Sequence, residues 1–256
     1  MSVPPFVEFR EATKRFGNGP LVLDRINLAA QRGEFVSLIG PSGCGKSTLL
    51  RLIAGLTPVS TGALTIDGLT PDDAAADLAF VFQEPTLLPW LTVAKNVELA
   101  PRLRGVSASA RSDSCRRVLD LVRLANRADA YPRQLSGGQK MRVSLARALA
   151  LEPKILLLDE PFGALDEMTR EHLNEELLVI HAQAGWTAFF VTHSVSEAVF
   201  LSNRIVVMSA NPGRIHTEIR VELPYPRTAE TRLSHAYHER VADVSRLLRS
   251  VETVAA

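Results

Sequence analysis

A segment near residue 40 combines the residue types and the spacing of a phosphate-binding loop. An apolar run over residues 35–39 leads into Gly-Pro-Ser-Gly-Cys-Gly-Lys-Ser-Thr, which fits the pattern G-x-x-x-x-G-K-S/T between a strand and a helix. Glycines let the backbone turn tightly, so that its N–H groups converge on phosphate oxygens at the positive end of the helix. Lys46 would meet the β- and γ-phosphates, and Ser47 would bind Mg²⁺. The expected phosphate-loop residues are Gly40, Pro41, Ser42, Gly43, Cys44, Gly45, Lys46, Ser47 and Thr48.

Two adjacent carboxylates at the end of a second apolar run could supply the other half of a magnesium–nucleotide site. Residues 155–158 are followed directly by Asp159 and Glu160. Such a pair is costly to bury unless a cation compensates, which predicts that Asp159 holds Mg²⁺ directly or through water. Successive strand side chains point to opposite sides, so Glu160 could polarise a water that attacks the γ-phosphate.

A third segment, Leu-Ser-Gly-Gly-Gln at residues 135–139, has the character of a second phosphate site. Ser136 is a natural N-cap for the helical pattern over residues 141–151. Gly137 and Gly138 leave a bulky anion free access to the N-terminus of that helix. A single nucleotide does not obviously need both this site and the phosphate loop.

The order of these segments resembles that of ATP-binding cassette (ABC) transporter ATPases, and the resemblance extends to about Pro224. In that family the signature motif, matched here by Ser136, Gly137, Gly138 and Gln139, closes over ATP held by the phosphate loop of another subunit. The resemblance therefore implies a head-to-tail ATPase pair, expected to be a homodimer, with ATP and Mg²⁺ between the subunits.

The resemblance also assigns roles to single residues. Gln83 matches the glutamine loop, which senses Mg²⁺ and the attacking water and links to the membrane subunit. His193 matches the switch histidine, which contacts the γ-phosphate and helps to position Glu160. Asp166 matches a residue that crosses the dimer seam. Phe16 stands where the family has an aromatic ring stacked on adenine, with a core position as the alternative. The expected catalytic residues are Glu160, His193, Gln83 and Lys46, and the expected metal ligands are Ser47, Gln83 and Asp159.

Longer motifs at residues 83–93, 159–166 and 208–215 resemble import ATPases for nitrate, aliphatic sulfonates and taurine. Ser194 and Ser196 replace residues that are often acidic in such relatives, but neither is a phosphate contact. The implied partners are two transmembrane permease subunits and an extracytoplasmic substrate-binding protein. The rival interpretation is a non-transport ABC ATPase that clamps nucleic acid or ribosomes; the second cassette, coiled coil or zinc-binding cysteines of such proteins are not visible. No nucleic-acid partner is expected.

The segments that carry the chemistry must be positioned by strands. Apolar runs at residues 35–39, 78–82, 155–158, 188–191 and 205–208 alternate with helical patterns, which predicts an α/β fold with a mostly parallel sheet. Residues 7–12, 21–28 and 63–66 alternate more strictly and predict an antiparallel sheet beside it. The expected class is a P-loop NTPase core with a mixed sheet, an antiparallel β subdomain and an inserted helical subdomain.

Residues of about 90–150 show only helical patterns, including 93–103 and 110–124, and are expected to be the subdomain inserted in an ABC ATPase domain of residues 1–224. Residues 225–256 predict a C-terminal tail formed by one amphipathic helix, which either packs on the core, as we favour, or docks a partner chain. Its apolar positions are Leu233, Tyr237, Val241, Val244, Leu248 and Val251. A separate apolar run, Leu87, Leu88, Trp90 and Leu91, either packs under the helical subdomain or faces the membrane partner.

Composition limits the classes of protein that remain. The 256 residues are 46% hydrophobic and 22% charged, enough for a full core, and the net charge of +1 provides no global attraction to nucleic acid or lipid. Only Cys44 and Cys115 are present, which excludes a disulfide framework. Neither a secretion signal nor a membrane-spanning run is visible, so we expect a protein that stays in the cytoplasm unless a partner carries it to a membrane. The resemblance to transporter ATPases implies a peripheral position on the cytoplasmic face of the inner membrane. The basic segment 101–147 is either a solvated face or a surface for an anionic partner.

Overall fold

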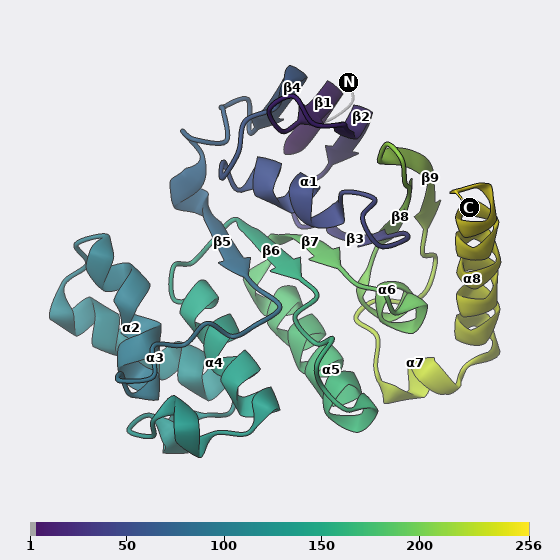
Figure 1. Cartoon of the computed structure of the whole chain (residues 1–256). Helices are drawn as coiled ribbons and strands as arrows, with labels where there is room; N and C mark the ends of the chain where they lie inside the picture. The colour runs from purple at the N-terminus through teal and green to yellow at the C-terminus, as the bar shows by residue number, and fades with distance from the viewer. Residues whose placement is uncertain (1–3, 256) are drawn as a thin grey trace.

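Two β-sheets form the framework of the part of the chain that the computed structural model describes, residues 4–255 (Figure 1). The smaller sheet is antiparallel and has the strand order β2-β1-β4. Its strands are β1 (Val7–Arg15), β2 (Leu21–Ala30) and β4 (Thr61–Ile66). The predicted antiparallel sheet is confirmed, and each strand is longer than its apolar alternation indicated.

The larger sheet has the order β5-β6-β7-β3-β8-β9. Its strands are β3 (Phe35–Ile39), β5 (Leu78–Val81), β6 (Ile155–Asp159), β7 (Thr187–Val191), β8 (Arg204–Ser209) and β9 (Arg214–Arg220). All neighbours are parallel except β8 and β9, which are antiparallel. Sequence reasoning missed β9, because this strand lies at the sheet edge and alternates between exposed and half-buried residues without a fully buried position.

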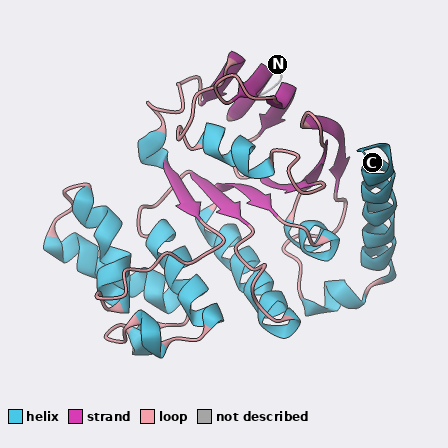
Figure 2. Cartoon of the chain, viewed as in Figure 1, coloured by secondary structure: helices cyan, strands magenta, loops and turns pink. Residues whose placement is uncertain are grey.

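The helices separate into groups on the two faces of the larger sheet (Figure 2). One face carries α1 (Lys46–Ile53), which lies between the two sheets (Figure 1). The opposite face carries α5 (Glu167–Ala184) and α6 (Val195–Leu201). Between β5 and β6 the chain forms α2 (Val93–Leu103), α3 (Ala108–Leu121) and α4 (Gly137–Leu149). Residues 93–149, all of them described, contain no strand, as the helical patterns predicted.

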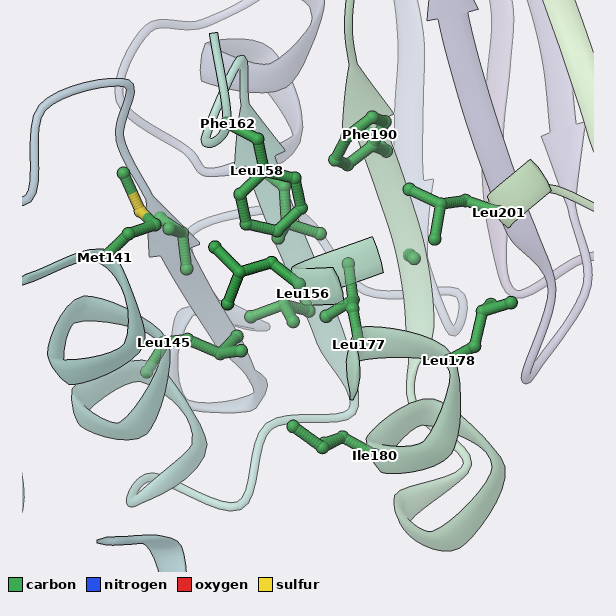
Figure 3. Close-up of a cluster of buried hydrophobic side chains, with 14 of the residues drawn as sticks. Met141, Leu145, Leu156, Leu158, Phe162, Leu177, Leu178, Ile180, Phe190 and Leu201 are labelled. Carbon is green, nitrogen blue, oxygen red and sulfur yellow. The ribbon is translucent and has the colours of Figure 1, made fainter. Parts of the chain in front are cut away.

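The apolar core has two parts, because alternate residues of the central strands face opposite sides of the sheet. Leu156 and Leu158 of β6 pack in the cluster that contains Leu177 of α5 and Met141 of α4, as Figure 3 shows. Ile155 and Leu157 belong to the second cluster, together with Leu49 and Leu50 of α1 and the inner face of the antiparallel sheet. The strand that ends in the two carboxylates is therefore held from both faces.

The C-terminal tail contains two helices where one was predicted. The structure has α7 (Ala229–Leu233) and α8 (His235–Ala255), separated at Ser234, whose Oγ accepts a hydrogen bond from the Tyr237 N–H at 3.2 Å. Since the chain turns there, Leu233 leaves the predicted apolar face and is 82% exposed. Tyr237, Val244 and Val251 are buried in the same cluster as Phe200 of α6, so the tail packs on the core. The division of the chain at about residue 224 stays a prediction, and residues 1–3 and 256 lie outside the described residues.

Most arginines of the basic segment 101–147 interact within the chain. Their partners include carboxylates on neighbouring elements, and Glu176 of α5 receives two of these arginines. Because these arginines already pair with carboxylates of the same chain, the pairs favour a solvated face over a binding surface for an anionic partner. They are Arg116–Asp113, Arg117–Glu152, Arg123–Glu176 and Arg142–Glu176. In residues 4–255 no helix is long and apolar enough to cross a membrane.

The buried face of α8 provides a test of tail packing. Val244→Ala should lower the free energy of unfolding by roughly 2 kcal/mol, because it leaves a cavity at a fully buried position. Leu247→Ala removes more atoms from a position that is 37% exposed, and should cost less than about 1 kcal/mol. Urea denaturation of both variants measures the difference. A larger loss for Leu247→Ala would contradict this packing.

Candidate nucleotide site

The phosphate loop and the predicted catalytic residues gather where parallel strands end at one edge of the larger sheet. In register, Leu38 of β3 lies beside Val191 of β7, and Asp159 of β6 pairs with the same Val191. Val81 of β5 pairs with Leu158. The segments that follow β3, β5, β6 and β7 therefore leave the sheet together. They contain the phosphate loop, Gln83, Glu160 and His193.

Close backbone contacts shape the phosphate loop. A Cβ atom on Gly40, which has φ 155°, would lie 2.4 Å from the carbonyl oxygen of Met208. A Cβ on Gly45, in the left-handed region with φ 94°, would lie 2.5 Å from Cδ2 of Leu23. Only glycine fits either place. Helix α1 begins directly after Gly45 without a side-chain cap, which leaves its first-turn N–H groups for an anion.

Lys46 is buried, and its ammonium group is held by the loop itself. Nζ donates hydrogen bonds to the carbonyl oxygens of Gly40 at 2.9 Å and Pro41 at 3.0 Å. A further contact joins Nζ to Sγ of Cys44 at 3.7 Å. The thiol is buried, which raises its pKa, so it fills space as a neutral group. The ammonium group of Lys46 is thus held by carbonyl oxygens of the phosphate loop itself.

Ser47 and Asp159 meet across the edge of the sheet. The Ser47 hydroxyl donates to Oδ1 of Asp159 at 2.9 Å. Burial raises the pKa of Asp159, although the Ser47 hydrogen bond opposes the shift. Hydroxyl and carboxylate oxygens are ligands that Mg²⁺ accepts together with phosphate oxygens. This half-buried carboxylate has a hydroxyl beside it, and within residues 4–255 no basic side chain donates a hydrogen bond to it, which fits the predicted ion.

Glu160 and His193 form a direct contact next to that pair. His193 Nε2 lies 2.8 Å from Glu160 Oε1, and both side chains are partly open to solvent. The backbone of Glu160 is left-handed, with φ 47°, and its N–H donates to Val191 O at 3.0 Å. A non-glycine residue in this region is uncommon and costs free energy, and such residues concentrate at functional sites.

Gln83 reaches the same place from the end of β5. Its Nε2 and Glu160 Oε2 both lie 3.9 Å from the position that a Cβ would take on Gly163. Three of the predicted catalytic residues, Gln83, Glu160 and His193, are therefore neighbours. Their roles in catalysis stay predictions.

The signature segment stands apart from the phosphate loop. Ser136 and Gln139 form a capping box at the start of α4: Ser136 Oγ accepts from Gln139 N at 3.3 Å, and Gln139 Oε1 accepts from Ser136 N at 3.0 Å. A Cβ on Gly138 would lie 2.9 Å from Cγ2 of Thr169 on α5. Throughout residues 4–255, neither a hydrogen bond nor an ion pair joins residues 135–139 to residues 40–48.

Asp166 and Phe16 are both at the surface. The Asp166 carboxylate accepts a hydrogen bond from Thr169 N at 3.0 Å and so caps α5, and this contact holds its pKa below the ordinary value. Phe16 is 48% exposed, and the Lys14 ammonium lies 4.7 Å from its ring centre. The alternative that Phe16 is a core residue is therefore wrong.

The apolar run after Gln83 is partly packed on the core and partly exposed, and its contact with a membrane partner stays a prediction. Leu87 packs against the larger apolar cluster, whereas Trp90 is 70% exposed. Residues that sequence reasoning missed hold this run in place. Asn96, buried on α2, donates to the carbonyl oxygens of residues 88, 91 and 92, and Arg147 of α4 donates to those of residues 85 and 86. The sequence signal that could have identified Asn96 is an asparagine at an apolar-face position of the amphipathic helical pattern over residues 93–103.

Comparison with known proteins agrees with this geometry. The family model described as ABC transporter matches residues 23–163. The aliphatic sulfonates import ATP-binding protein SsuB of Bacillus cereus is 49% identical over 207 residues, which cover 81% of this chain and 81% of that protein. The nitrate import ATP-binding protein NrtD of Synechocystis is 44% identical over 239 residues, or 91% of this chain and 90% of that protein.

Solved structures give the same result. The dimeric bacterial ABC transporter cassette MJ0796 has a TM-score of 0.75 and 34% identity, and the match covers 85% of this chain and 100% of that chain. The structure of cbiO1 from Clostridium perfringens, at 23% identity and a TM-score of 0.81, covers 98% of this chain and 100% of that chain and supports the fold alone. The fold and the site define a phosphate-loop ATPase of the cassette type. The chain belongs to the ABC transporter ATP-binding family.

The contacts of Lys46 predict its importance for nucleotide affinity. Lys46→Met should weaken ATP binding about 10- to 100-fold, because a phosphate then loses its charge-assisted hydrogen bonds. Lys154→Met is the matched control, since Lys154 pairs with Asp77 at 2.8 Å and is 54% exposed. Isothermal titration with ATP measures both variants. Normal affinity in Lys46→Met would show that the phosphate loop has been misinterpreted.

Proposed function

We propose that this ABC ATPase is the ATP-hydrolysing subunit of an importer, in which two copies close on two Mg·ATP and act on two permease subunits. The contact between Glu160 and His193, beside Ser47 and Asp159, carries this proposal. The Glu160 carboxylate lies 2.8 Å from the His193 imidazole, at the edge of the sheet where the phosphate loop also begins, and this supports a role as proton acceptor. A site that only bound nucleotide would need no such acceptor.

The proposed reaction is hydrolysis of the terminal phosphoanhydride bond of ATP. Lys46 and the N–H groups at the start of α1 would bind the β- and γ-phosphates. Ser47 and Asp159, with Gln83 nearby, would hold Mg²⁺, and the bound ion would neutralise part of the phosphate charge. Glu160 would accept a proton from the attacking water, and His193 would hold its carboxylate. The water oxygen becomes part of the released phosphate, and ADP leaves with the bridging oxygen.

The position of the signature segment supports a dimer. Ser136 and the N-terminus of α4 are not joined to the phosphate loop of their own chain, and a second copy could bring them to it. Both segments would then share one ATP, as the predicted head-to-tail arrangement requires. The solved structures of MJ0796, which describe a dimer and a dimer with ADP and Pi, are consistent with this assembly.

The names of two relatives indicate the direction of transport and the class of solute. Both SsuB and NrtD are described as import ATP-binding proteins, the first for aliphatic sulfonates and the second for nitrate. We extend this to the present chain and propose that it energises uptake of nitrate, sulfonates, taurine or a related small solute. The substrate would arrive from an extracytoplasmic binding protein, and the ATPase pair would sit on the cytoplasmic face of the membrane against the permease. The exposed Trp90 supports such a contact near Gln83.

Replacing Glu160 tests hydrolysis and dimer closure together. Glu160→Gln should lower ATP turnover by at least about 100-fold, because the proton acceptor is lost, while ATP binding persists. The variant should accumulate as an ATP-bound dimer in size-exclusion chromatography with light scattering. Glu239→Gln, at an exposed site on α8, should behave as the unmodified protein. Undiminished turnover would remove Glu160 from the role of base.

Transport is tested in cells. A strain lacking the gene should lose uptake of at least one of nitrate, taurine and alkanesulfonates, because the permease has no other energy source. The unmodified gene should restore that uptake, and the Glu160→Gln gene should not. Radiolabelled or mass-spectrometric uptake measures each solute. Intact uptake of all of them would contradict the proposed substrate class.

A further inference from the structure

A buried carboxylate lies behind the loop that carries His193. Glu197, on α6, has a side chain that is 7% exposed. Its Oε2 accepts a hydrogen bond from the hydroxyl of Thr192, the residue before His193. The same hydroxyl accepts from the Ser194 N–H at 2.9 Å. Glu197 therefore holds the backbone on both sides of His193 through one threonine.

The other oxygen of Glu197 faces α5. Oε1 lies 3.9 Å from Nε of Arg170 and accepts from Asn174 Nδ2 at 3.5 Å. Burial raises the pKa of Glu197, and the charges of Arg170 and of Arg232 on α7 oppose that shift. At 3.9 Å the interaction with Arg170 is an ion pair and not a hydrogen bond. A small movement of either side chain would strengthen or weaken it.

Arg170 also holds the segment that begins α5. Its Nη2 donates to the carbonyl oxygen of Leu165 at 2.8 Å. Asp166 follows Leu165, and its carboxylate caps the helix on which Arg170 lies one turn later. Continuous contacts thus run from residues 165–166, through Arg170 and Glu197, to Thr192 and His193.

The Arg170–Glu197 ion pair does more than fill space between α5 and α6, because the expected gain in stability from such a pair is small. Arg170 is 29% exposed and Glu197 is 7% exposed, so only the carboxylate is buried. An ion pair removed from water contributes little net stability compared with apolar side chains of similar size, whereas loss of the arginine leaves the buried carboxylate less compensated. Many apolar residues could fill the space between α5 and α6. The two charges join residues 165–166, which the proposed function places at the dimer contact, to Thr192 and His193, which it places beside the attacking water.

We infer that Arg170 and Glu197 are positioning residues that couple residues 165–166 to His193 within one subunit. Contact of a second copy with Asp166 would then be transmitted to the imidazole that orients Glu160. Neither residue touches ATP. The inference rests on the proposed roles of His193 and Asp166.

Arg170→Met tests the link, because methionine keeps an unbranched stem and removes the charge. We expect kcat for ATP to fall about 10- to 100-fold, the loss typical of a small misplacement of catalytic groups, with KM changed less than about threefold. Arg170→Lys should recover much of kcat. Glu197→Gln keeps an oxygen that can accept from Thr192 and tests the same link from the other side.

Arg204→Met is the matched control. Arg204 is 13% exposed and pairs with Glu34 at 2.7 Å, at the start of β8 and at the edge of the sheet opposite His193. Its loss should lower the unfolding temperature but leave kcat within about twofold. An equal fall in kcat for Arg204→Met would make the Arg170 effect a general loss of stability and overturn the inference.

The decisive measurement repeats Arg170→Met in a His193→Ala background under single-turnover conditions. If Arg170 acts through His193, the second substitution should cause no further loss of rate, whereas a merely structural arginine would cost the same in both backgrounds. Equal losses, or unchanged kcat in Arg170→Met alone, would overturn the link and leave the proposed function intact. Full activity of His193→Ala would instead refute the role of His193 itself, and the inference with it.

Discussion

The geometry of parallel strands is the constraint on which the site depends. Strands β5, β6, β7 and β3 run in one direction, so the residues that follow them meet at one edge although more than a hundred positions separate them in sequence. The apolar clusters on both faces fix the ends of these strands, and the ends fix Asp159, Glu160 and His193. Loss of packing far from the nucleotide would therefore displace the chemistry.

The sequence was sufficient for most of this arrangement because the informative signals are local. A buried strand followed by glycines and a lysine has few structural solutions. All strands of both sheets except β9 lie at the apolar runs that predicted them. Strand β9 and the turn at Ser234 escaped for the opposite reason. Strand β9 lies at the sheet edge, and its exposed polar residues alternate with half-buried ones, so it has no run of buried residues. The helix break at Ser234 leaves the spacing of the apolar residues almost unchanged.

Long-range polar contacts are the part that spacing did not reveal. Arg147 donates to residues 85 and 86 from a helix 61 and 62 positions away, and Arg170 on α5 pairs with Glu197 on α6. Asn96 and Glu197 instead hold loops that lie within eight residues of themselves. Periodicity records only that such residues lie near an apolar face. The side-chain partners of buried polar groups depend on the fold as a whole. They also explain why loops without regular structure, such as residues 85–92, keep a defined course beside the catalytic groups.

The hydrogen bonds of Lys46 to Gly40 and Pro41 have a consequence for ligand exchange. Since the carbonyl oxygens of the loop accept from the lysine, a phosphate must compete with them for the ammonium group, while the turn itself needs little rearrangement. Capture should then be limited by diffusion and by the breaking of those carbonyl contacts. On this basis nucleotide exchange would proceed by a switch of the Lys46 hydrogen bonds, without refolding of the glycine turn.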